Sequence, residues 1–515
     1  MEVMGVEAFA KRVPSKTALV DGERSVSFAE LDGRMNQLAR VLHCQGVGAG
    51  DRIASAVSNR VEWFEVAGAA ARVGATVVPV SWRNMHDEVA YLVKDSEAKL
   101  IFAEPDAADV MAGLPAVFVG AQYEGMLRAE TDVPLEASVE RPLIGFRYYT
   151  SGTTGQPKAI EGEMPTGERL AALRAAFMPP ATAGLRGADG KRRLGRGQTE
   201  GLEGADEVHL LVGPAYHTAP GTFANRALSY GQTVVVMRHF DAEECLRLMQ
   251  DHRVTWSHMV PINFVRILKL PEAVRRRFDL SSVRRILHAA APCPVDVKRA
   301  IMEVFPSGTV YEYYGATEGL ATVCPADEWL RKPGTVGRAA PGVEVRVYDD
   351  DGNQAAPGDV GTVYFSPMMR FSYAGAPEKT KQAWRDDFFT AGDMGFLDED
   401  GYLFLTDRKI DLIITGGANV YPAEVEAVLI MHTAVADVAV FGIPDAEWGE
   451  RVHAVIELRA PADESDIMTF CRGRLAHYKC PTSVEIVEDL PRDPNGKIRK
   501  RLLRGKHWHE GEKKI

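Results

Sequence analysis

Cysteine is scarce in this chain: only six of its 515 residues are cysteines, and no two of them form a C-x-x-C pair. Disulfide-rich secreted domains and cysteine-based zinc sites place their cysteines in close pairs or dense clusters. Scattered thiols are typical of a protein that is kept reduced inside the cell. The sequence therefore predicts neither a disulfide framework nor a zinc site.

Excess positive charge and long apolar runs are also lacking. The formal net charge is -11 and the pI is about 5.7, which argues against nucleic acid as the main partner because a phosphate backbone needs a basic surface. No apolar run approaches the length of a membrane span, and the first residues lack the basic-then-apolar pattern of a signal peptide. We expect a soluble, cytoplasmic protein without a membrane span.

The chain does contain short apolar segments that alternate with helical stretches. Strands are predicted at 53–57 and 75–80, and helices at 28–42 and 63–71. Alternation at this spacing favours parallel sheets with crossover helices. Because 515 residues are too many for one hydrophobic core, the predicted fold class is α/β with more than one domain.

The stretch 148–158 reads YYTSGTTGQPK and follows a short apolar segment at 143–146 that is typical of a buried strand. Its glycines let backbone N–H groups approach anionic oxygens, its hydroxyl side chains add neutral donors, and Lys158 supplies a positive charge. It is not a Walker A loop, because no Gly-Lys-Ser/Thr follows at the required spacing. The composition suits a polyphosphate, although such a loop taken alone is more often a surface turn.

Two later segments place polar side chains where a nucleotide can use them. In YEYYGATE at 311–318, an aromatic ring offers adenine a stacking face, the Thr317 hydroxyl can bond an α-phosphate, and the Glu318 carboxylate can hold Mg²⁺. In TAGD at 390–393, the carboxylate of Asp393 can accept both ribose hydroxyl protons. Taken alone, the first segment is equally typical of a strand end and the second of a turn.

The pattern changes towards the C-terminus. Residues 333–406 hold short strands broken by Gly, Pro and Asp, which predicts a small β-rich subdomain. The charged tract TDRKIDLIITGG at 406–417 leads into an apolar strand and a double glycine, which is typical of a domain boundary. Near the end, LPRDPNGKI at 490–498 predicts a tight exposed turn that carries Lys497.

These motifs resemble those of the adenylate-forming superfamily, which comprises acyl-CoA synthetases, luciferases and peptide-synthetase adenylation domains. The resemblance covers about residues 10–505 and favours the CoA-ligase branch. It implies a large N-terminal domain at 1–407, built of stacked parallel α/β sheets plus the β-rich subdomain. It also implies a small mobile α+β domain at 408–515 and a hinge at about 407–411.

The resemblance also implies roles for individual residues. Thr317, Glu318 and Lys497 are the implied catalytic residues, together with His217, which ends the segment PAYH and is similar to the residue that gates the acyl pocket. Glu318 is the implied Mg²⁺ ligand. The residues implied to bind ATP, acyl-AMP or CoA are Thr150, Ser151, Gly152, Thr153, Thr154, Gly155, Lys158, Ala289, Ala290, Ala291, Tyr314, Gly315, Asp393, Arg408, Gly416 and Gly417.

The implied reaction joins a carboxylic acid to CoA through an acyl-AMP intermediate. The implied cofactors are ATP or acyl-AMP, Mg²⁺ and coenzyme A, and Lys497 is carried into and out of the active site as the small domain rotates. Rotation presents Gly416 and Gly417 to a pantetheine tunnel, where a side chain would narrow the channel. The small residues at 289–291 leave room for a bulky, polycyclic acid. A homodimer is the default assembly.

Three departures from the family pattern affect these expectations. Ala159 stands where glycine is usual, and Glu161 and Glu163 bring carboxylates beside the phosphate loop. If the backbone at 159 is left-handed, alanine costs roughly 1 kcal/mol or more, and each carboxylate repels the phosphates. These terms predict adenylation slowed by about tenfold or more, with thioester formation from a preformed adenylate retained. A displaced, harmless loop end is an equal alternative.

The other two departures are Ile410 at the expected pivot, where a charged residue is usual, and Ala391 before Gly-Asp, which we consider minor. Two further function classes stay open. One is a luciferase-like or stand-alone carrier-protein-loading adenylating enzyme. The other is a non-enzymatic nucleotide-binding regulator or scaffold. The retention of Lys497, Glu318, Asp393 and Arg408 argues against it.

Overall fold

The structure is a computed structural model that describes residues 5–136, 145–150, 157–162, 204–367, 369–408, 411–416, 418–445, 447–492 and 498–508. Most of the predicted phosphate loop, Gly417, Ile410, Glu163 and Lys497 therefore lie outside the described residues. The side chains of Thr150 and Arg408 are likewise outside the description, although their backbone positions are given.

The largest sheet confirms the predicted parallel α/β fold. The strands from β13 through β12, β11, β9 and β10 to β1 run parallel. At one edge β2 is antiparallel to β1; at the other β14 is antiparallel to β13, and β15 to β14. The bounds of these strands are β1 Thr17–Asp21, β2 Arg24–Ser27, β9 Val208–Leu211, β10 Thr233–Val236, β11 Trp256–Met259, β12 Arg285–His288, β13 Val310–Ala316, β14 Gly319–Cys324 and β15 Arg338–Ala339.

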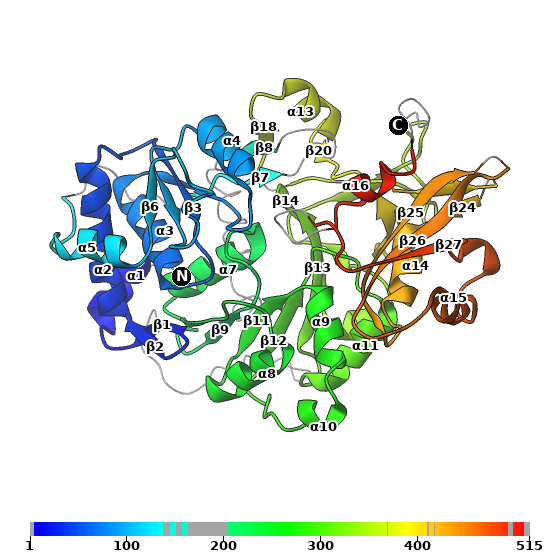
Figure 1. The fold of residues 1–515 in the computed structure, drawn as a ribbon, viewed down its shortest axis with the longest axis horizontal. Helices are drawn as coiled ribbons and strands as arrows, with labels where there is room; N and C mark the ends of the chain where they lie inside the picture. The colour runs from blue at the N-terminus through cyan, green and yellow to red at the C-terminus, as the bar shows by residue number, and fades with distance from the viewer. Residues whose placement is uncertain are drawn as a thin grey trace.

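A second parallel sheet, in the order β4-β3-β5-β6, lies beside the first (Figure 1). The predicted strands at 53–57 and 75–80 are confirmed as β3 and β4. Its strands are β3 Arg52–Ala56, β4 Thr76–Pro79, β5 Ile101–Ala103 and β6 Ala116–Phe118.

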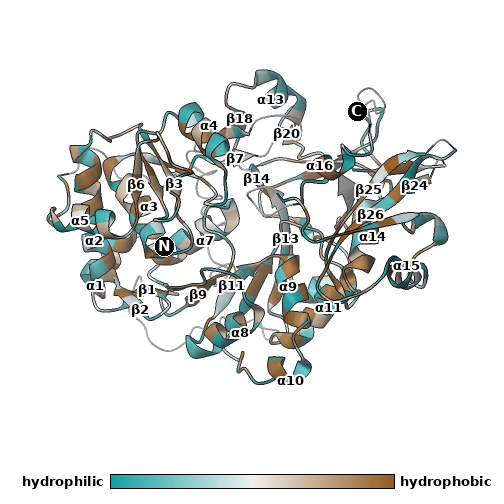
Figure 2. Cartoon of the chain, viewed as in Figure 1, coloured by the Kyte–Doolittle hydropathy of each residue, from teal (hydrophilic) through white to brown (hydrophobic). Residues whose placement is uncertain are grey.

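Helices α2 (Phe28–Cys44) and α3 (Val61–Val73) share one buried core with strands of both parallel sheets. Helix α2 begins where the Ser27 hydroxyl accepts a hydrogen bond from the Glu30 backbone N–H at 3.1 Å, which satisfies a free donor of the first turn. Hydrophobic colour is concentrated on the strands in Figure 2, whereas polar colour marks outward faces of the helices. The stacked-sheet prediction is therefore confirmed.

Strands that follow β15 take part in two further sheets. One has the order β19-β20-β17-β21-β22, with β16 paired to β17, and another has the order β18-β8-β7. The second sheet joins both ends of the phosphate-loop segment to a strand far along the chain. The bounds are β7 Tyr149–Thr150, β8 Lys158–Gly162, β16 Val345–Tyr348, β17 Gly361–Phe365, β18 Phe371–Tyr373, β19 Trp384–Arg385, β20 Phe388–Phe389, β21 Asp393–Leu397 and β22 Leu403–Arg408.

The last part of the described chain builds a sheet in the order β24-β23-β26-β25, with β27 parallel to β26. It occupies the orange and red side of Figure 1. Its strands are β23 Ile413–Thr415, β24 Ala418–Val420, β25 Val435–Asp445, β26 Gly449–Leu458 and β27 Ser483–Val487. The boundary and hinge proposed at 407–411 stay predictions.

The remaining helices cover these sheets, and no helix among the described residues is long and apolar enough to cross a membrane. Their bounds are α1 Gly5–Arg12, α4 His86–Ser96, α5 Ala121–Arg128, α7 Thr218–Ser229, α8 Ala242–Asp251, α9 Pro261–Leu268, α10 Glu272–Arg275, α11 Val295–Val304, α12 Ala326–Arg331, α13 Pro377–Ala383, α14 Pro422–Leu429, α15 Glu464–Arg472 and α16 Lys500–Arg504.

A buried ion pair in the large sheet gives a stability prediction. Arg285 on β12 donates to the carboxylate of Glu207 at 2.6 and 2.7 Å, and both side chains are 2% exposed. Replacing Glu207→Gln leaves the guanidinium buried without its counter-charge, so we expect the free energy of unfolding to fall by about 3–5 kcal/mol. Urea unfolding followed by tryptophan fluorescence measures the change.

The matched control is Glu272→Gln, which breaks an exposed pair with Arg276 and should cost less than about 1 kcal/mol. Equal losses in the two variants would contradict the argument from burial.

Candidate nucleotide and acyl site

A cleft of about 3860 Å³ opens at the carboxyl ends of β9, β11, β12 and β13, the edge at which open parallel sheets bind ligands. Its lining includes segments that follow each of these strands, together with residues of the β-rich sheets and of the C-terminal region. Residues predicted from separate motifs line this one cleft: His217, Ala289, Ala290, Ala291, Tyr314, Gly315, Thr317, Glu318 and Asp393. Lys158 is not part of the lining.

The hairpin between β13 and β14 carries the central polar groups. Ala316 pairs with Gly319, so Thr317 and Glu318 form the two-residue connection, and Thr317 is exposed to the cleft. The register shifts at Gly315, where an added Cβ would overlap the Gly319 carbonyl oxygen and lie 3.0 Å from the Leu320 Cα. A glycine is therefore required for the close approach that produces this turn.

Tyr314 and Asp393 connect the large sheet to the β-rich sheet. The Tyr314 hydroxyl donates a hydrogen bond to the Asp393 carboxylate at 2.7 Å. On β21, Asp393 lies in register with Arg408 on β22, so the backbone brings together two residues predicted to contact the nucleotide. Near them, the Thr390 hydroxyl accepts a hydrogen bond from the Gly392 N–H at 3.0 Å. The predicted ribose carboxylate thus lies beside the predicted adenine-stacking ring.

Glu318 is positioned by residues that the motifs did not reveal. The Tyr373 hydroxyl of β18 donates to the Glu318 carboxylate at 2.8 Å, and burial, then the charge of Glu318, raises the pKa of Tyr373. The Lys379 ammonium of α13 lies 4.0 Å from the centre of the Tyr373 ring. One carboxylate beside an open cleft suits Mg²⁺, which is usually held by one or two carboxylates plus substrate phosphates.

The two ends of the phosphate loop are held together as paired strands. Thr150 of β7 lies opposite Lys158 of β8, while Ser151, Gly152, Thr153, Thr154 and Gly155 between them lie outside the described residues. The Tyr91 hydroxyl of α4 donates to the Pro157 carbonyl at 2.8 Å. Burial and Asp95 raise the pKa of Tyr91, whereas the nearby Lys158 ammonium lowers it. Helix α4 therefore supports the base of the loop.

The surroundings of Ala159 and Glu161 differ from those that the prediction of impaired adenylation assumes. Ala159 is fully buried in extended strand β8, and its φ is not positive. The Glu161 carboxylate forms an ion pair with Arg147 at 2.8 Å. The backbone condition for a cost at Ala159 is therefore not met, and the charge of Glu161 has a counter-charge. Glu163 lies outside the described residues, and impaired adenylation itself stays a prediction.

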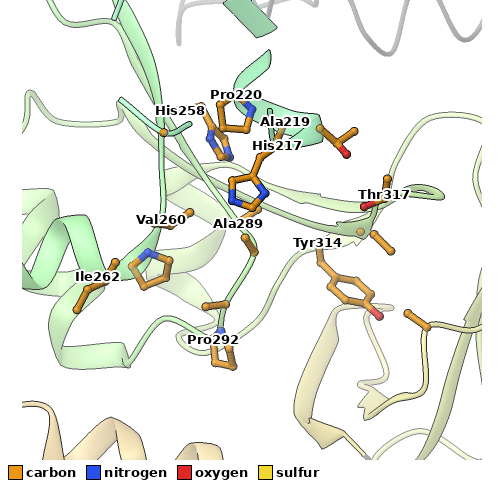
Figure 3. A pocket seen from close by; sticks show the side chains of 18 of the residues that line it. His217, Ala219, Pro220, His258, Val260, Ile262, Ala289, Pro292, Tyr314 and Thr317 are labelled. Atoms are coloured by element: carbon orange, nitrogen blue, oxygen red, sulfur yellow. The ribbon is translucent and has the colours of Figure 1, made fainter. Parts of the chain in front are cut away.

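Aromatic side chains line the end of the cleft near His217, and Figure 3 shows the His217 and His258 rings close together there. His217 precedes helix α7, and its ring centre lies 4.6 Å from that of Tyr216. Burial, then His217, lowers the pKa of His258 to about 3, so the His258 imidazole is neutral near pH 7. Its Nε2 lies 2.9 Å from the Tyr313 hydroxyl. Phe223 contacts both rings, at 5.5 Å from His258 and 6.2 Å from Tyr313.

The small-residue segment after β12 forms the wall between the aromatic end and the hairpin, as Ala289 and Tyr314 show in Figure 3. Ala289 is buried, whereas Ala290 and Ala291 are exposed to the cleft. Ala290 has a φ of 75°, an unfavourable conformation for a residue with a Cβ. Such strain is concentrated at ligand sites in proteins.

Gly416 has a structural reason to be glycine in addition to its predicted CoA role. Its φ is 55°, and an added Cβ would overlap the ring of Trp448. The Gly416 N–H donates to the Trp448 carbonyl at 2.8 Å. Gly416 is not part of the lining of the cleft in this conformation, and the role of Gly416 and Gly417 at a pantetheine tunnel stays a prediction.

The stacked parallel sheets, the cleft at their carboxyl edge and the smaller C-terminal region define the class of adenylate-forming enzymes. The chain matches the AMP-binding enzyme family over residues 6–369 and the AMP-binding enzyme C-terminal domain over residues 424–497. It belongs to the AMP-binding enzyme family, and the predicted membership of the adenylate-forming superfamily is confirmed.

Three relatives illustrate the similarity. The chain is 31% identical to a fatty acid–[acyl-carrier-protein] ligase of Streptomyces coeruleorubidus, over 98% of this chain and 96% of the relative. It is 33% identical to a feruloyl-CoA synthase of Amycolatopsis, over 96% of both chains. The solved o-succinylbenzoate CoA synthetase of Bacillus subtilis, in complex with its acyl-adenylate intermediate, matches with a TM-score of 0.78 and 26% identity, over 99% of both chains.

We predict that Gly315→Ala weakens Mg·ATP binding. The added methyl group pushes the two strands of the hairpin apart and displaces Thr317 and Glu318. Overpacking of this kind costs about 1–3 kcal/mol, so we expect the Kd measured by calorimetry to rise by about tenfold. Gly125→Ala on α5 is the control, because its added Cβ meets open space, and it should leave the Kd unchanged.

We also predict that Lys379 contributes to phosphate binding. Lys379 lines the cleft, as Glu318 does. Burial is the main cause that lowers the pKa of Lys379, and the nearby charge of Lys158 lowers it further. Replacing Lys379→Gln removes about 1 kcal/mol of attraction to the phosphates, which raises the Kd for Mg·ATP by about fivefold. Lys381→Gln changes an exposed lysine of the same helix. If both variants shift the Kd equally, Lys379 has no specific role.

Proposed function

We propose that the chain is an AMP-forming acid–CoA ligase that completes both half-reactions at this cleft. The observation that carries the proposal is the convergence of Tyr314, Glu318 and Asp393 with the ends of the phosphate loop, in a chain of the AMP-binding enzyme family. The names of the relatives, which are acid ligases acting on CoA or on a carrier protein, support the same reaction class. A cytoplasmic location, where ATP and CoA are available, belongs to the proposal.

In the first half-reaction a carboxylate oxygen attacks the α-phosphorus of ATP, the bond to the β-phosphate breaks, and pyrophosphate leaves. Most of the catalysis in such a step is positioning and neutralisation of charge. The Thr317 hydroxyl, exposed to the cleft, would bind an α-phosphate oxygen, and Glu318 would hold Mg²⁺, which would supply positive charge to neutralise the phosphates. Lys497 would neutralise the carboxylate and the α-phosphate as they approach.

In the second half-reaction the sulfur of CoA attacks the acyl carbonyl carbon, the bond to the phosphate oxygen breaks, and AMP leaves. Adenylation is needed because a carboxylate repels a thiolate and has no adequate leaving group. If Lys497 neutralises charge in the first step, it must leave before the thiol attacks, so the small domain would rotate between the steps. His217, at the start of α7, lines this cleft and would gate its acyl end.

The substrate class that suits the acyl end is an aromatic acid. Phe223, Trp256, His258 and Tyr313 offer aromatic faces and edges around it, and aromatic pairs add about 0.5–1.5 kcal/mol beyond buried area. The neutral imidazole of His258, hydrogen-bonded to Tyr313, adds no charge there. This refines the bulky, polycyclic acid expected from the sequence.

Paired assays of the two half-reactions test the proposal. Pyrophosphate release and thioester formation are measured with aromatic acids and straight-chain fatty acids, ATP and CoA. A second assay supplies a synthetic aryl adenylate and CoA, and a third replaces CoA with a phosphopantetheinylated carrier protein. We expect turnover of aromatic acids in the first assay, thioester formation from the adenylate in the second, and little transfer in the third.

The variant Lys497→Ala should reduce pyrophosphate release by about 10²–10³-fold, while thioester formation from the adenylate persists. The control Lys11→Ala changes an exposed lysine of α1 that does not line the cleft and should retain both activities. Wild-type activity with the adenylate alone would favour the thioesterification-only enzyme. Transfer to the carrier protein alone would favour a carrier-loading enzyme, and silence in every assay a non-enzymatic scaffold.

A further inference from the structure

Two histidines and a glutamate come together in the C-terminal region, outside the lining of the nucleotide cleft. His453 lies on β26, Glu485 on β27 and His507 just beyond α16, and one possible ligand atom of each lies within 4.8 Å of those of the other two. Because β26 and β27 pair in parallel with His453 opposite Ser483, Glu485 falls on the same face as His453. None of the three lines the cleft.

We propose that His453, Glu485 and His507 bind a divalent transition-metal ion of the Zn²⁺ type. Two imidazoles and a carboxylate are a donor set that Zn²⁺ accepts, and three protein ligands leave one tetrahedral position for water or another ligand. The scattered cysteines predicted no zinc site. The site is hidden in the sequence because its three residues are brought together only by the pairing of β26 with β27 and the return of the chain after α16.

The hydrogen bonds of the cluster suit ligation. The His453 Nδ1 lies 2.7 Å from the Ser483 hydroxyl, which orients the ring and leaves Nε2 as the ligand atom, as outer-shell partners do in metal sites. Nε2 of His453 and Nε2 of His507 are both buried, and neither has a hydrogen-bond partner among the residues that the structure describes. Buried polar atoms without partners are rare and costly, and a shared metal ion satisfies both.

The surroundings leave Glu485 available to the ion. Its Oε2 faces His453 Nε2 at 3.8 Å, whereas its Oε1 lies 4.0 Å from the ammonium of Lys506, an exposed side chain. Phe441 lies behind both imidazoles, with ring centres 5.3 Å from His453 and 6.1 Å from His507. The carboxylate can therefore ligate through one oxygen, and the aromatic ring shields the site from water on one side.

The position of the ion gives it a mechanical role. It would join the end of the segment 498–508, which follows Lys497 in the chain, to the sheet that contains β26 and β27 (Figure 1). Binding to the folded state alone raises stability, so the metal would fasten this segment to the C-terminal sheet. The site itself does not depend on the proposed ligase activity.

Titration of the chelator-treated full chain with Zn²⁺ tests the site without ATP, acid or CoA, so failure here leaves the ligase proposal untouched. By calorimetry we expect one equivalent to bind, and by thermal unfolding we expect Zn²⁺ to raise the Tm. His507→Gln and Glu485→Gln should each weaken binding by about tenfold or more and remove most of the Tm shift. Co²⁺ in place of Zn²⁺ should give visible absorption bands that both variants lose.

His43→Gln, which changes an exposed histidine of α2, is the control and should bind Zn²⁺ as the wild type does. Circular dichroism of the metal-free variants checks that they fold, and Glu485→Gln, at a partly exposed position, keeps the test valid if His507→Gln does not. Absence of a bound equivalent in the wild type would overturn the proposal. So would binding that neither folded variant weakens.

Discussion

The close approach of β13 and β14 at Gly315 is the constraint on which the candidate site depends. Without a Cβ at this position the backbone of Gly319 comes against Gly315, and the chain reverses within two residues. The same turn holds Thr317 and Glu318 at the carboxyl edge of the large sheet. Tyr314, one residue earlier, is fixed by its hydrogen bond to Asp393. One glycine therefore sets the relative positions of groups from two sheets.

Two carboxylates near the ends of the phosphate loop have partners in the structure. Glu161 is paired with Arg147, and Glu318 is held by the Tyr373 hydroxyl with the Lys379 ammonium over the same ring. At an effective dielectric constant of about 20, an unpaired charge 4 Å away is worth about 4 kcal/mol. Local pairing of this kind thus decides whether the carboxylates beside the loop hinder ATP binding, which is why their presence in the sequence is not sufficient evidence of impairment.

Much of the fold could be predicted from the sequence, because apolar periodicity marks elements such as α2, β3 and β4, and because the motifs lie where parallel strands end. Tyr373 and Lys379 could not be found in this way. Tyr373 reaches Glu318 across 55 residues of chain, through a pairing of β18 with β8 that no local pattern specifies. The extended backbone of Ala159 was equally hidden, since it is set by pairing with β7 and β18. Local sequence patterns therefore predict the type of each element, whereas the pairing of strands that are distant in sequence determines which side chains meet at the site.

In the proposed mechanism Lys497 leaves the cleft between the half-reactions, which needs a support that moves as one piece, and the described residues on either side of it have contacts suited to such a support. Arg492 pairs with Asp437 at 2.9 Å and Arg504 with Asp411 at 3.1 Å, both within the C-terminal region; the Arg504 and Asp411 side chains are 13% and 19% exposed, and the Arg492 and Asp437 side chains 32% and 21%. Arg499 instead reaches across to Glu88 of α4 at 2.9 Å, and both of these side chains are more than a third exposed. An exposed pair is worth at most about 1 kcal/mol, so this contact can break while the more buried pairs persist. A metal ion on His507 would add to the internal contacts alone, and would therefore make the segment stiffer without opposing its movement.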